Sequence, residues 1–217
     1  ANTDKYEGTA EQWEHAQGVM KELLDDLGIE YKVGVDEAAF YGPKLDIQIK
    51  NVFGKEDTIV TIQIDMLLAE KFGMYYIDEN NDKVLPYIIH RTSMGCYERT
   101  LALLIEKYAG ALPTWMAPEQ VRFLPVTERA VDYCNALAKN LEMEGFRVTV
   151  DARNEKIGKK IREGQIEKVP YMLVVGDRDM ENGTVSPRHR ADGDLGAMDF
   201  ADFAKILKEV VDTKAKK

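Results

Sequence analysis

The alternation of short apolar runs with amphipathic segments over residues 121–213 limits the fold of this chain more than any other feature. The order is βαβαββα, which predicts a small α/β domain with a mixed, mostly parallel sheet. A proline at position 187 favours an edge position for the last strand. We place the strands at 121–126, 146–151, 171–177 and 184–190, and the helices at 127–145, 156–169 and 199–213.

Residues 1–113 follow a different pattern. Thr9 is a suitable N-cap for a helix that continues to Gly28. Apolar and polar residues alternate over 45–50 and 58–67, as in strands with one buried face, and a third apolar run covers 84–90. This half is predicted to be α+β, an antiparallel sheet with helices to one side. The helix after the third run is expected to bury an apolar stripe, formed by Leu101, Leu104, Ile105 and Tyr108.

The segment 109–120 marks the natural boundary between the two halves. It contains Pro113 and Pro118, and the charge balance changes across it. The formal net charge is −9, and because Lys/Arg and Asp/Glu balance in residues 114–217, the acidic excess lies in the first half. We predict two domains, 1–113 and 114–217.

Composition argues against a membrane protein and against a secreted one. No apolar run is long enough to span a bilayer, and no signal-peptide pattern opens the chain. Cys96 and Cys134 lack metal-ligand spacing, which favours a reducing, cytoplasmic location. The chain begins with Ala1 rather than Met, so we expect it to be a piece of a longer protein.

A basic segment stands out in this acidic chain. Between Arg147 and Arg162 there are six Lys/Arg and two acidic residues, and a predicted strand-to-helix turn in the segment carries Asn154. Most charged runs on helices are solvated faces. A polar turn beside basic residues also suits hydrogen bonding to unstacked RNA bases, and the sequence leaves both readings open.

His90 and Arg99 lie close together in the first half. A single histidine after an apolar run is most often structural, and as a metal ligand it would need partners that this chain does not place nearby. Arg99 falls in the first turn of a helix that follows Gly95. It either pairs with an acidic neighbour, Glu98 or Asp65, or belongs to an anion or nucleotide site at the helix N-terminus.

One predicted face of the first sheet is polar. Gln63 and Asp65 share that face on their strand, and Asp46 and Gln48 lie on the polar face of theirs. A solvated face would explain them, but paired amides and carboxylates can also read the donors and acceptors of a small ligand. The adjoining loop "AFYGPK" is either an ordinary turn or a binding edge.

Several segments, in order, resemble the threonyl-tRNA synthetases, a family of class II aminoacyl-tRNA synthetases. "EAAFYGPKLDIQIK", "TIQIDMLLAEKFGMYYIDE" and "IIHRTSMGCYERTLALLIEKYAGALPTWMAP" are similar to the late part of the family's catalytic domain. "DARNEKIGKKIRE" and "VPYMLVVGDRD" are similar to its anticodon-binding domain. The resemblance covers the whole chain, and "GCYER" matches the class II motif 3 pattern.

The resemblance implies roles for individual residues. Arg99 and Lys44 would act in catalysis, and His90 would be one ligand of a catalytic zinc whose other ligands lie before Ala1. Cys96 stands where many members have Ser, which weakens one expected contact with ATP. The implied ATP-binding residues are Arg99, Gly95, Cys96 and Gln63, and the implied threonine-binding residues are Tyr41 and Gln63. The implied anticodon-binding residues are Asn154, Glu155, Arg162, Asp179 and Arg188, with Lys156, Lys159 and Lys160 on RNA phosphates.

The resemblance also implies an activity. The whole enzyme, as a homodimer with Zn²⁺ and with Mg²⁺ and ATP, would activate threonine and transfer it to tRNA(Thr). We expect residues 1–217 alone to bind tRNA but to give no ATP–pyrophosphate exchange, because half of the electrostatic clamp on ATP is missing; measurable exchange by the purified chain would contradict this. The alternative is a truncated, non-catalytic paralogue that regulates through RNA binding. The presence of Arg99, His90 and Gln63 favours the enzyme.

Overall fold

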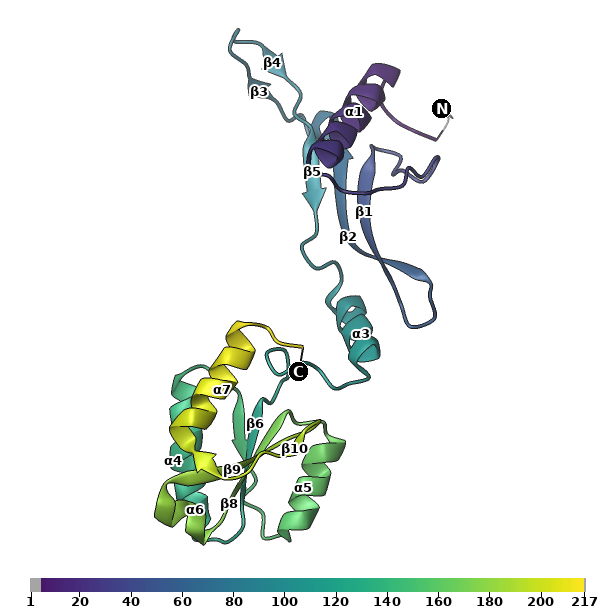
Figure 1. Cartoon of the computed structure of the whole chain (residues 1–217). Coiled ribbons are helices and arrows are strands. Elements are labelled where there is room, and N and C mark those ends of the chain that lie inside the picture. Colours follow the sequence, from purple (N-terminus) through teal and green to yellow (C-terminus); the bar gives the residue numbers. More distant parts are fainter. Residues whose placement is uncertain (1–4, 217) are drawn as a thin grey trace. The chain divides into compact units, whose positions relative to one another are not determined.

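The structure is a computed structural model that describes residues 5–216. The chain divides into two compact units, Ala1–Leu103 and Leu104–Lys217, which are called the N-terminal and C-terminal units below (Figure 1). The domain boundary between residues 113 and 114 stays a prediction. No helix in the described part of the chain is both long enough and apolar enough to cross a membrane.

The N-terminal unit is built on a three-stranded antiparallel sheet with the order β1-β2-β5. The strands are β1 (Lys44–Lys50), β2 (Glu56–Asp65) and β5 (Ile88–Arg91). The predicted antiparallel sheet is confirmed, but the third strand is shorter than the apolar run suggested. Only Val84 of its early part lies in a strand, in a separate hairpin of β3 (Tyr76–Ile77) and β4 (Lys83–Val84), and residues 85–87 lead from this hairpin to β5.

Two helices complete this unit, α1 (Ala10–Asp26) and the short α2 (Leu68–Lys71). Helix α1 begins as the sequence indicated. The hydroxyl of Thr9 accepts a hydrogen bond from the Gln12 amide, and the Gln12 side chain accepts one from the Thr9 amide. This capping box satisfies two backbone donors that would otherwise be unpaired at the helix start.

Helix α3 (Tyr97–Tyr108) buries its apolar stripe only in part, with Leu104 and Tyr108 half-buried. No residue of α3 is fully buried, and Leu101 and Ile105 are 53% and 47% exposed. Helical spacing places apolar side chains on one face, but it does not provide an element that packs against that face.

The C-terminal unit has a mixed sheet with the order β10-β9-β8-β6-β7. Strands β6 (Val121–Pro125), β7 (Val148–Val150) and β8 (Tyr171–Val175) are parallel, and β9 (Thr184–His189) is antiparallel to β8. The predicted mostly parallel core is confirmed. Two short strands were not predicted, β10 (Gly193–Asp194) and β11 (Met198–Asp199), and they pair with opposite ends of β9.

The helices of this unit cover both faces of its sheet (Figure 1). They are α4 (Ala130–Met143), α5 (Ile157–Ile166), α6 (Asp177–Asn182) and α7 (Phe200–Asp212), of which α6 was not predicted. Alternate residues of β6 point to opposite faces. Phe123 packs in the main core with α4 and α7, whereas Leu124 packs in a smaller cluster with residues of α5.

Candidate functional site

A row of polar residues crosses the sheet of the N-terminal unit. Lys44 of β1 pairs with Gln63 of β2, which pairs with His90 of β5, so the three side chains share one face. The hydroxyl of Tyr41, just before β1, donates a 2.7 Å hydrogen bond to Oε1 of Gln63. The Tyr41 ring stands edge-on to the His90 ring, with centroids 6.1 Å apart. Four of the predicted site residues are thus brought together, and we call Tyr41, Lys44, Gln63 and His90 the polar row.

Asp65 fixes the orientation of His90. Its carboxylate is fully buried, and Oδ2 lies 2.8 Å from Nε2 of His90. Oδ1 accepts hydrogen bonds of 2.9 Å from the amides of Leu67 and Leu68. Burial raises the pKa of Asp65, but the hydrogen bonds from the Leu68 amide, His90 and the Leu67 amide outweigh it and hold the pKa below its ordinary value. An ionised carboxylate only accepts, so Nε2 of His90 carries the proton of this contact.

The sequence did not assign this role to Asp65. It offered Asp65 as a partner of Arg99, whereas the structure pairs it with His90. The available signal was spacing: Asp65 lies two residues after Gln63 and therefore on the same face of the strand.

Lys44 is held at the edge of the polar row by Asp46. Its ammonium pairs with Oδ2 of Asp46, and Oδ1 of Asp46 accepts a 2.7 Å hydrogen bond from the Thr61 hydroxyl. The side chain of Lys44 remains 27% exposed. Its charge is therefore reachable by an anion, although a bound anion would compete with Asp46.

The described residues do not form a zinc site on their own. They contain no group of three or more His, Cys, Asp or Glu side chains that could hold a metal ion. His90 offers one nitrogen, and a tetrahedral zinc takes three or four protein ligands. The residues therefore fit a single ligand of a shared site at most, and we derive no chemical step from the metal.

The predicted nucleotide residues Gly95, Cys96 and Arg99 lie near the other end of β2. Gly95 has φ +66°, and a Cβ there would stand 2.2 Å from the carbonyl oxygen of Ile59. Only glycine allows this approach. Nη1 of Arg99 donates a 3.1 Å hydrogen bond to the Thr58 carbonyl, and the Cys96 thiol donates to Glu98.

These contacts separate the predicted ATP-binding residues into two groups. Thr58 and Gln63 are five residues apart on β2, which is about 16 Å along an extended strand. Gln63 belongs to the polar row, while Arg99 is anchored beside Thr58. The first turn of α3 is exposed, so the guanidinium of Arg99 is accessible to solvent.

In the C-terminal unit, the predicted anticodon residues come from four elements. Asn154 and Glu155 lie on the exposed turn that follows β7, and Arg162 is exposed on α5. Glu155 accepts a 2.6 Å hydrogen bond from Nζ of Lys159. Arg188 on β9 pairs with Asp194 at 3.0 Å and lies opposite Met172, on the face of the sheet that α5 covers.

Asp179 has internal partners. It accepts hydrogen bonds from the Gly176 amide at 2.9 Å and from the hydroxyls of Thr184 and Ser186 at 3.1 and 3.2 Å. These contacts cap α6 and tie it to β9. The turn with Asn154 follows β7 and α6 follows β8, so both lie at the carboxyl edge of the parallel strands, where ligands of such sheets bind.

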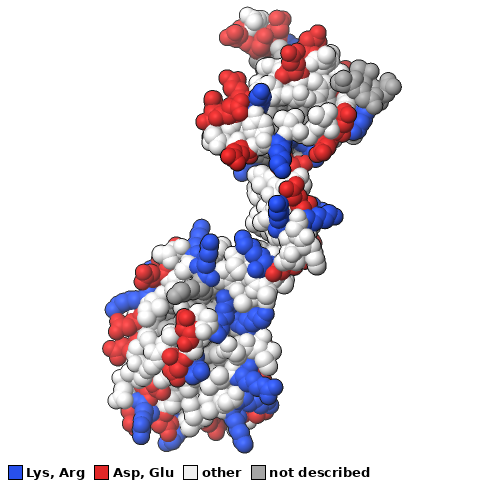
Figure 2. Space-filling view, turned by 45° about the vertical axis from the view of Figure 1, so that its right-hand side comes forward, with Lys and Arg blue, Asp and Glu red and all other residues white. Residues whose placement is uncertain are grey.

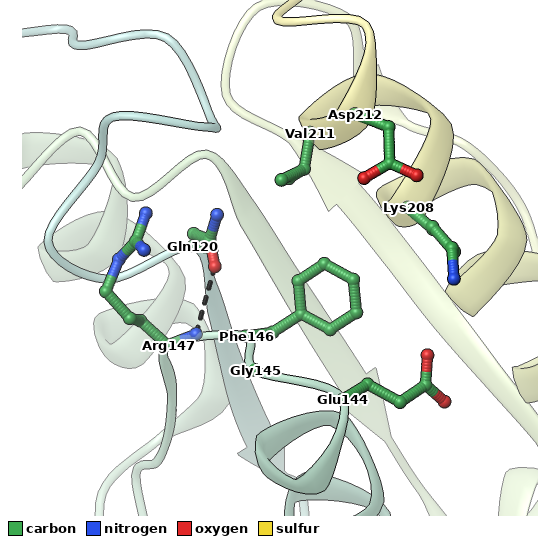
Figure 3. A pocket seen from close by; sticks show the side chains of 8 residues that line it. All are labelled: Gln120, Glu144, Gly145, Phe146, Arg147, Lys208, Val211 and Asp212. Carbon is green, nitrogen blue, oxygen red and sulfur yellow. Dashed lines mark hydrogen bonds between the residues drawn. The ribbon is translucent and has the colours of Figure 1, made fainter.

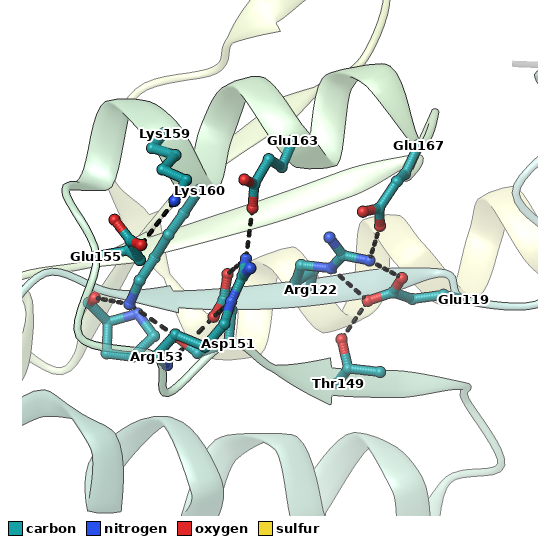
Figure 4. A network of polar contacts seen from close by, with 11 residues as sticks. Glu119, Arg122, Thr149, Asp151, Arg153, Glu155, Lys159, Lys160, Glu163 and Glu167 are labelled. Atoms are coloured by element: carbon teal, nitrogen blue, oxygen red, sulfur yellow. Dashed lines mark hydrogen bonds and ion pairs between the residues drawn. The ribbon is translucent and has the colours of Figure 1, made fainter.

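Most Lys and Arg side chains of the basic segment bind acceptor groups of the protein itself. Arg147 donates to the carbonyls of Ala117 and Trp115 at 2.8 and 2.9 Å. Lys160 is buried, and its Nζ donates to the carbonyls of Pro125 and Asp151 at 3.1 and 2.8 Å (Figure 4). This burial does not fit the predicted contact of Lys160 with RNA phosphates. A helical pattern in the sequence does not reveal which lysine faces the sheet.

A small pocket lies elsewhere on the C-terminal unit (Figure 3). It has a volume of about 140 Å³ and is formed where the chain enters β6 and β7, against α7. Its lining residues are Gln120, Glu144, Gly145, Phe146, Arg147, Lys208, Val211 and Asp212. None of the predicted site residues belongs to it, and it lies at the opposite edge of the sheet from Asn154.

Charge is distributed unevenly over the surface (Figure 2). In that view, acidic side chains gather on the N-terminal unit, and Lys and Arg are frequent on the C-terminal unit. Both signs are mixed on the C-terminal unit, so the acidic excess of the chain lies on the N-terminal unit.

Comparison with known families gives a match for each unit. Residues 5–108 match the family described as "tRNA synthetase class II core domain (G, H, P, S and T)". Residues 120–210 match the family described as "Anticodon binding domain".

Curated relatives and solved structures point the same way. The threonine–tRNA ligase of Clostridium perfringens (strain SM101) is 58% identical over 96% of this chain and 33% of the relative, and that of Clostridium botulinum (strain Eklund 17B) is 53% identical over 98% and 33%. The RNA-binding domain of threonyl-tRNA synthetase from Cryptosporidium parvum superposes with a TM-score of 0.84 at 32% identity, covering 95% of this chain and 52% of that one. This chain spans about a third of the length of the curated relatives it matches.

Proposed function

This chain belongs to the threonyl-tRNA synthetase family, and we propose that it supplies part of the threonine and ATP site and the whole anticodon reader of a threonine–tRNA ligase. The whole protein, acting in the cytoplasm as a homodimer, would join threonine to ATP as threonyl-adenylate with Mg²⁺. It would then transfer threonine to the 3′ end of tRNA(Thr). The observation that carries the proposal is the polar row, in which three strands and a loop present Tyr41, Lys44, Gln63 and His90 on one face.

The polar row has the chemistry that a threonine site needs. The Gln63 amide is oriented by the Tyr41 hydroxyl and can exchange hydrogen bonds with a polar ligand. Sites that bind a substrate hydroxyl reject an isostere that lacks it far better than an apolar pocket does. We propose that Tyr41 and Gln63 position threonine and that Lys44, released from Asp46, contacts the adenylate. His90 would supply one zinc ligand of the whole enzyme, where the metal would supply Lewis-acid chemistry for the polar groups of threonine.

Arg99 is proposed to hold ATP from the start of α3. Its guanidinium can stack on adenine or neutralise a phosphate, and its present partner is a single carbonyl oxygen. Gly95 and Cys96 would contact the same nucleotide. The separation of this group from the polar row suits an extended ligand in which adenine lies far from the amino acid.

The C-terminal unit is proposed to read anticodon bases with Asn154, Glu155, Arg162, Asp179 and Arg188. Support comes from the exposed turn at the carboxyl edge of the sheet and from the family match over residues 120–210. Exposed amide and carboxylate groups suit the base edges of a single-stranded loop. Lys156 and Arg162, which are exposed, would meet phosphates or bases nearby.

Binding to tRNA tests this proposal directly. We expect the purified chain to bind a threonine-tRNA transcript about tenfold or more tighter than the same transcript with a changed anticodon, because one lost base contact costs on the order of 1–3 kcal/mol. The preference should persist when salt is raised, although both affinities fall. Filter binding at two salt concentrations measures it.

The matched control is Asn154→Ala, which removes a base-reading group and leaves the charge unchanged. It should reduce the preference without altering the salt dependence. Equal and strongly salt-sensitive binding of both transcripts by the unaltered chain would contradict anticodon reading.

A further inference from the structure

Lys160 is an unusual residue because its charge lies inside the C-terminal unit. The residue is 3% exposed, and its ammonium donates to the carbonyl of Pro125, the last residue of β6, and to that of Asp151, just after β7 (Figure 4). A buried ammonium is costly unless its donors are used. Lys160 therefore joins α5 to the carboxyl ends of two neighbouring strands.

Arg153 makes a second connection at the same place. Its guanidinium binds the Asp151 carboxylate through two hydrogen bonds of 2.8 and 2.7 Å, and it also binds Glu163 of α5 at 2.7 Å. The Arg153 amide also donates to Oδ1 of Asp151, at 3.2 Å. Asp151 is almost fully buried, so this paired carboxylate is a fixed point at the base of the turn.

Both connections meet at the start of residues 151–156, which we call the reading turn. Lys160 holds the Asp151 carbonyl, and Arg153 ties the Asp151 carboxylate to Glu163 of α5 (Figure 4). Asn154 and Glu155 are exposed on the turn. To reach an RNA phosphate, Lys160 would leave two carbonyls without their donor, and Arg153 would leave the buried Asp151 unpaired. Neither movement is compatible with an intact turn.

We propose that Lys160 and Arg153 are positioning residues that hold the reading turn in its base-binding shape and do not contact RNA phosphates. This inference rests on the proposed anticodon function of Asn154 and Glu155. The proposal gives the cations of the basic segment two different roles. Lys160 and Arg153 set the shape of the reading turn, and the exposed Lys156 is free to contact RNA phosphates. A turn that is already ordered binds bases without a further cost of ordering.

The test uses the whole chain and four single variants. Lys160→Met and Arg153→Met remove the two connections. Lys156→Met removes an exposed cation of the same turn, and Lys139→Met makes the same chemical change at an exposed site on α4. Each protein is examined by amide hydrogen exchange of residues 151–156 and by binding to the threonine-tRNA transcript and its changed-anticodon version over a series of salt concentrations.

For Lys160→Met and Arg153→Met, we expect faster exchange in the reading turn and loss of most of the anticodon preference. The slope of log affinity against log salt should stay that of the unaltered chain. Lys156→Met should lower that slope by about 0.7, the value for one phosphate contact on a single strand, and keep the preference. Lys139→Met should change neither quantity.

A fall in salt slope with the preference retained would show that Lys160 or Arg153 contacts phosphate, and it would overturn the proposal. Unchanged exchange in the reading turn would also overturn it. If Lys160→Met does not fold, Arg153→Met decides, because the Arg153 side chain is 54% exposed and its loss leaves no cavity. If the unaltered chain shows no anticodon preference, the proposed function fails, while the exchange measurement still decides whether these cations fix the turn.

Discussion

Replacing Phe203 with alanine is expected to lower the free energy of unfolding of the C-terminal unit by about 3–5 kcal/mol, the usual cost of truncating a buried phenylalanine. Phe203 is fully buried on α7, and its ring stands edge-on to that of Tyr171, with centroids 5.5 Å apart. It belongs to the main core that joins α4, α7 and the sheet. Its removal leaves a cavity among helices and strands that cannot all move inward together.

Urea denaturation followed by tryptophan fluorescence measures this loss. The chain has two tryptophans, Trp13 in the N-terminal unit and Trp115 in the C-terminal unit, so a Trp13→Phe background isolates the signal of interest. The control is Ile166→Ala, since Ile166 is 65% exposed, and it should change stability by no more than about 0.5 kcal/mol. Surface substitutions usually change stability by no more than about 0.5 kcal/mol. A loss of less than about 1 kcal/mol for Phe203→Ala would therefore contradict the packing described above.

Replacing Asp65 with alanine is expected to lower the free energy of unfolding of the N-terminal unit by about 3 kcal/mol, because several charge-assisted hydrogen bonds are lost together. The amides of Leu67 and Leu68 and Nε2 of His90 all lose their acceptor. The substitution should also release the His90 ring. Trp13 fluorescence in a Trp115→Phe background measures stability, and ¹⁵N chemical shifts of the His90 ring report its tautomer.

Asp65→Asn separates the two effects of this residue. Its remaining oxygen can still accept from the Leu67 and Leu68 amides, so more than half of the stability should return. Its amide cannot accept from Nε2, so the proton should move to Nδ1 of His90. A His90 ring that keeps its Nε2 proton in both variants would show that Asp65 does not orient it.

Local patterns in the sequence were enough to predict most elements of both units. The capping box at Thr9 and the alternating residues of β1 and β2 are formed by neighbours in the chain, and the structure has them where they were expected. The strand and helix order of the C-terminal half likewise gave its parallel core. Helix α6 was not predicted because it spans only Asp177–Asn182, less than two turns, and so has no apolar periodicity to detect.

The candidate site was predictable as a set of residues but not as an arrangement. The resemblance to a family selected Tyr41, Lys44, Gln63 and His90, and strand pairing then placed them in one row. That Asp65 holds His90 follows from the register of β2 against β5, which no local pattern specifies.

The sequence by itself determined the order of elements, the two fold classes and the residues on which function is proposed, because these depend on spacing between near neighbours. Only the tertiary structure decided which charged side chains are at the surface, where they can contact a ligand. Lys160 and Lys159 are adjacent in the same helix, yet one donates to buried carbonyls and the other pairs with Glu155 at the surface. A turn of about 100° per residue separates their directions, and the sheet lies on one side only.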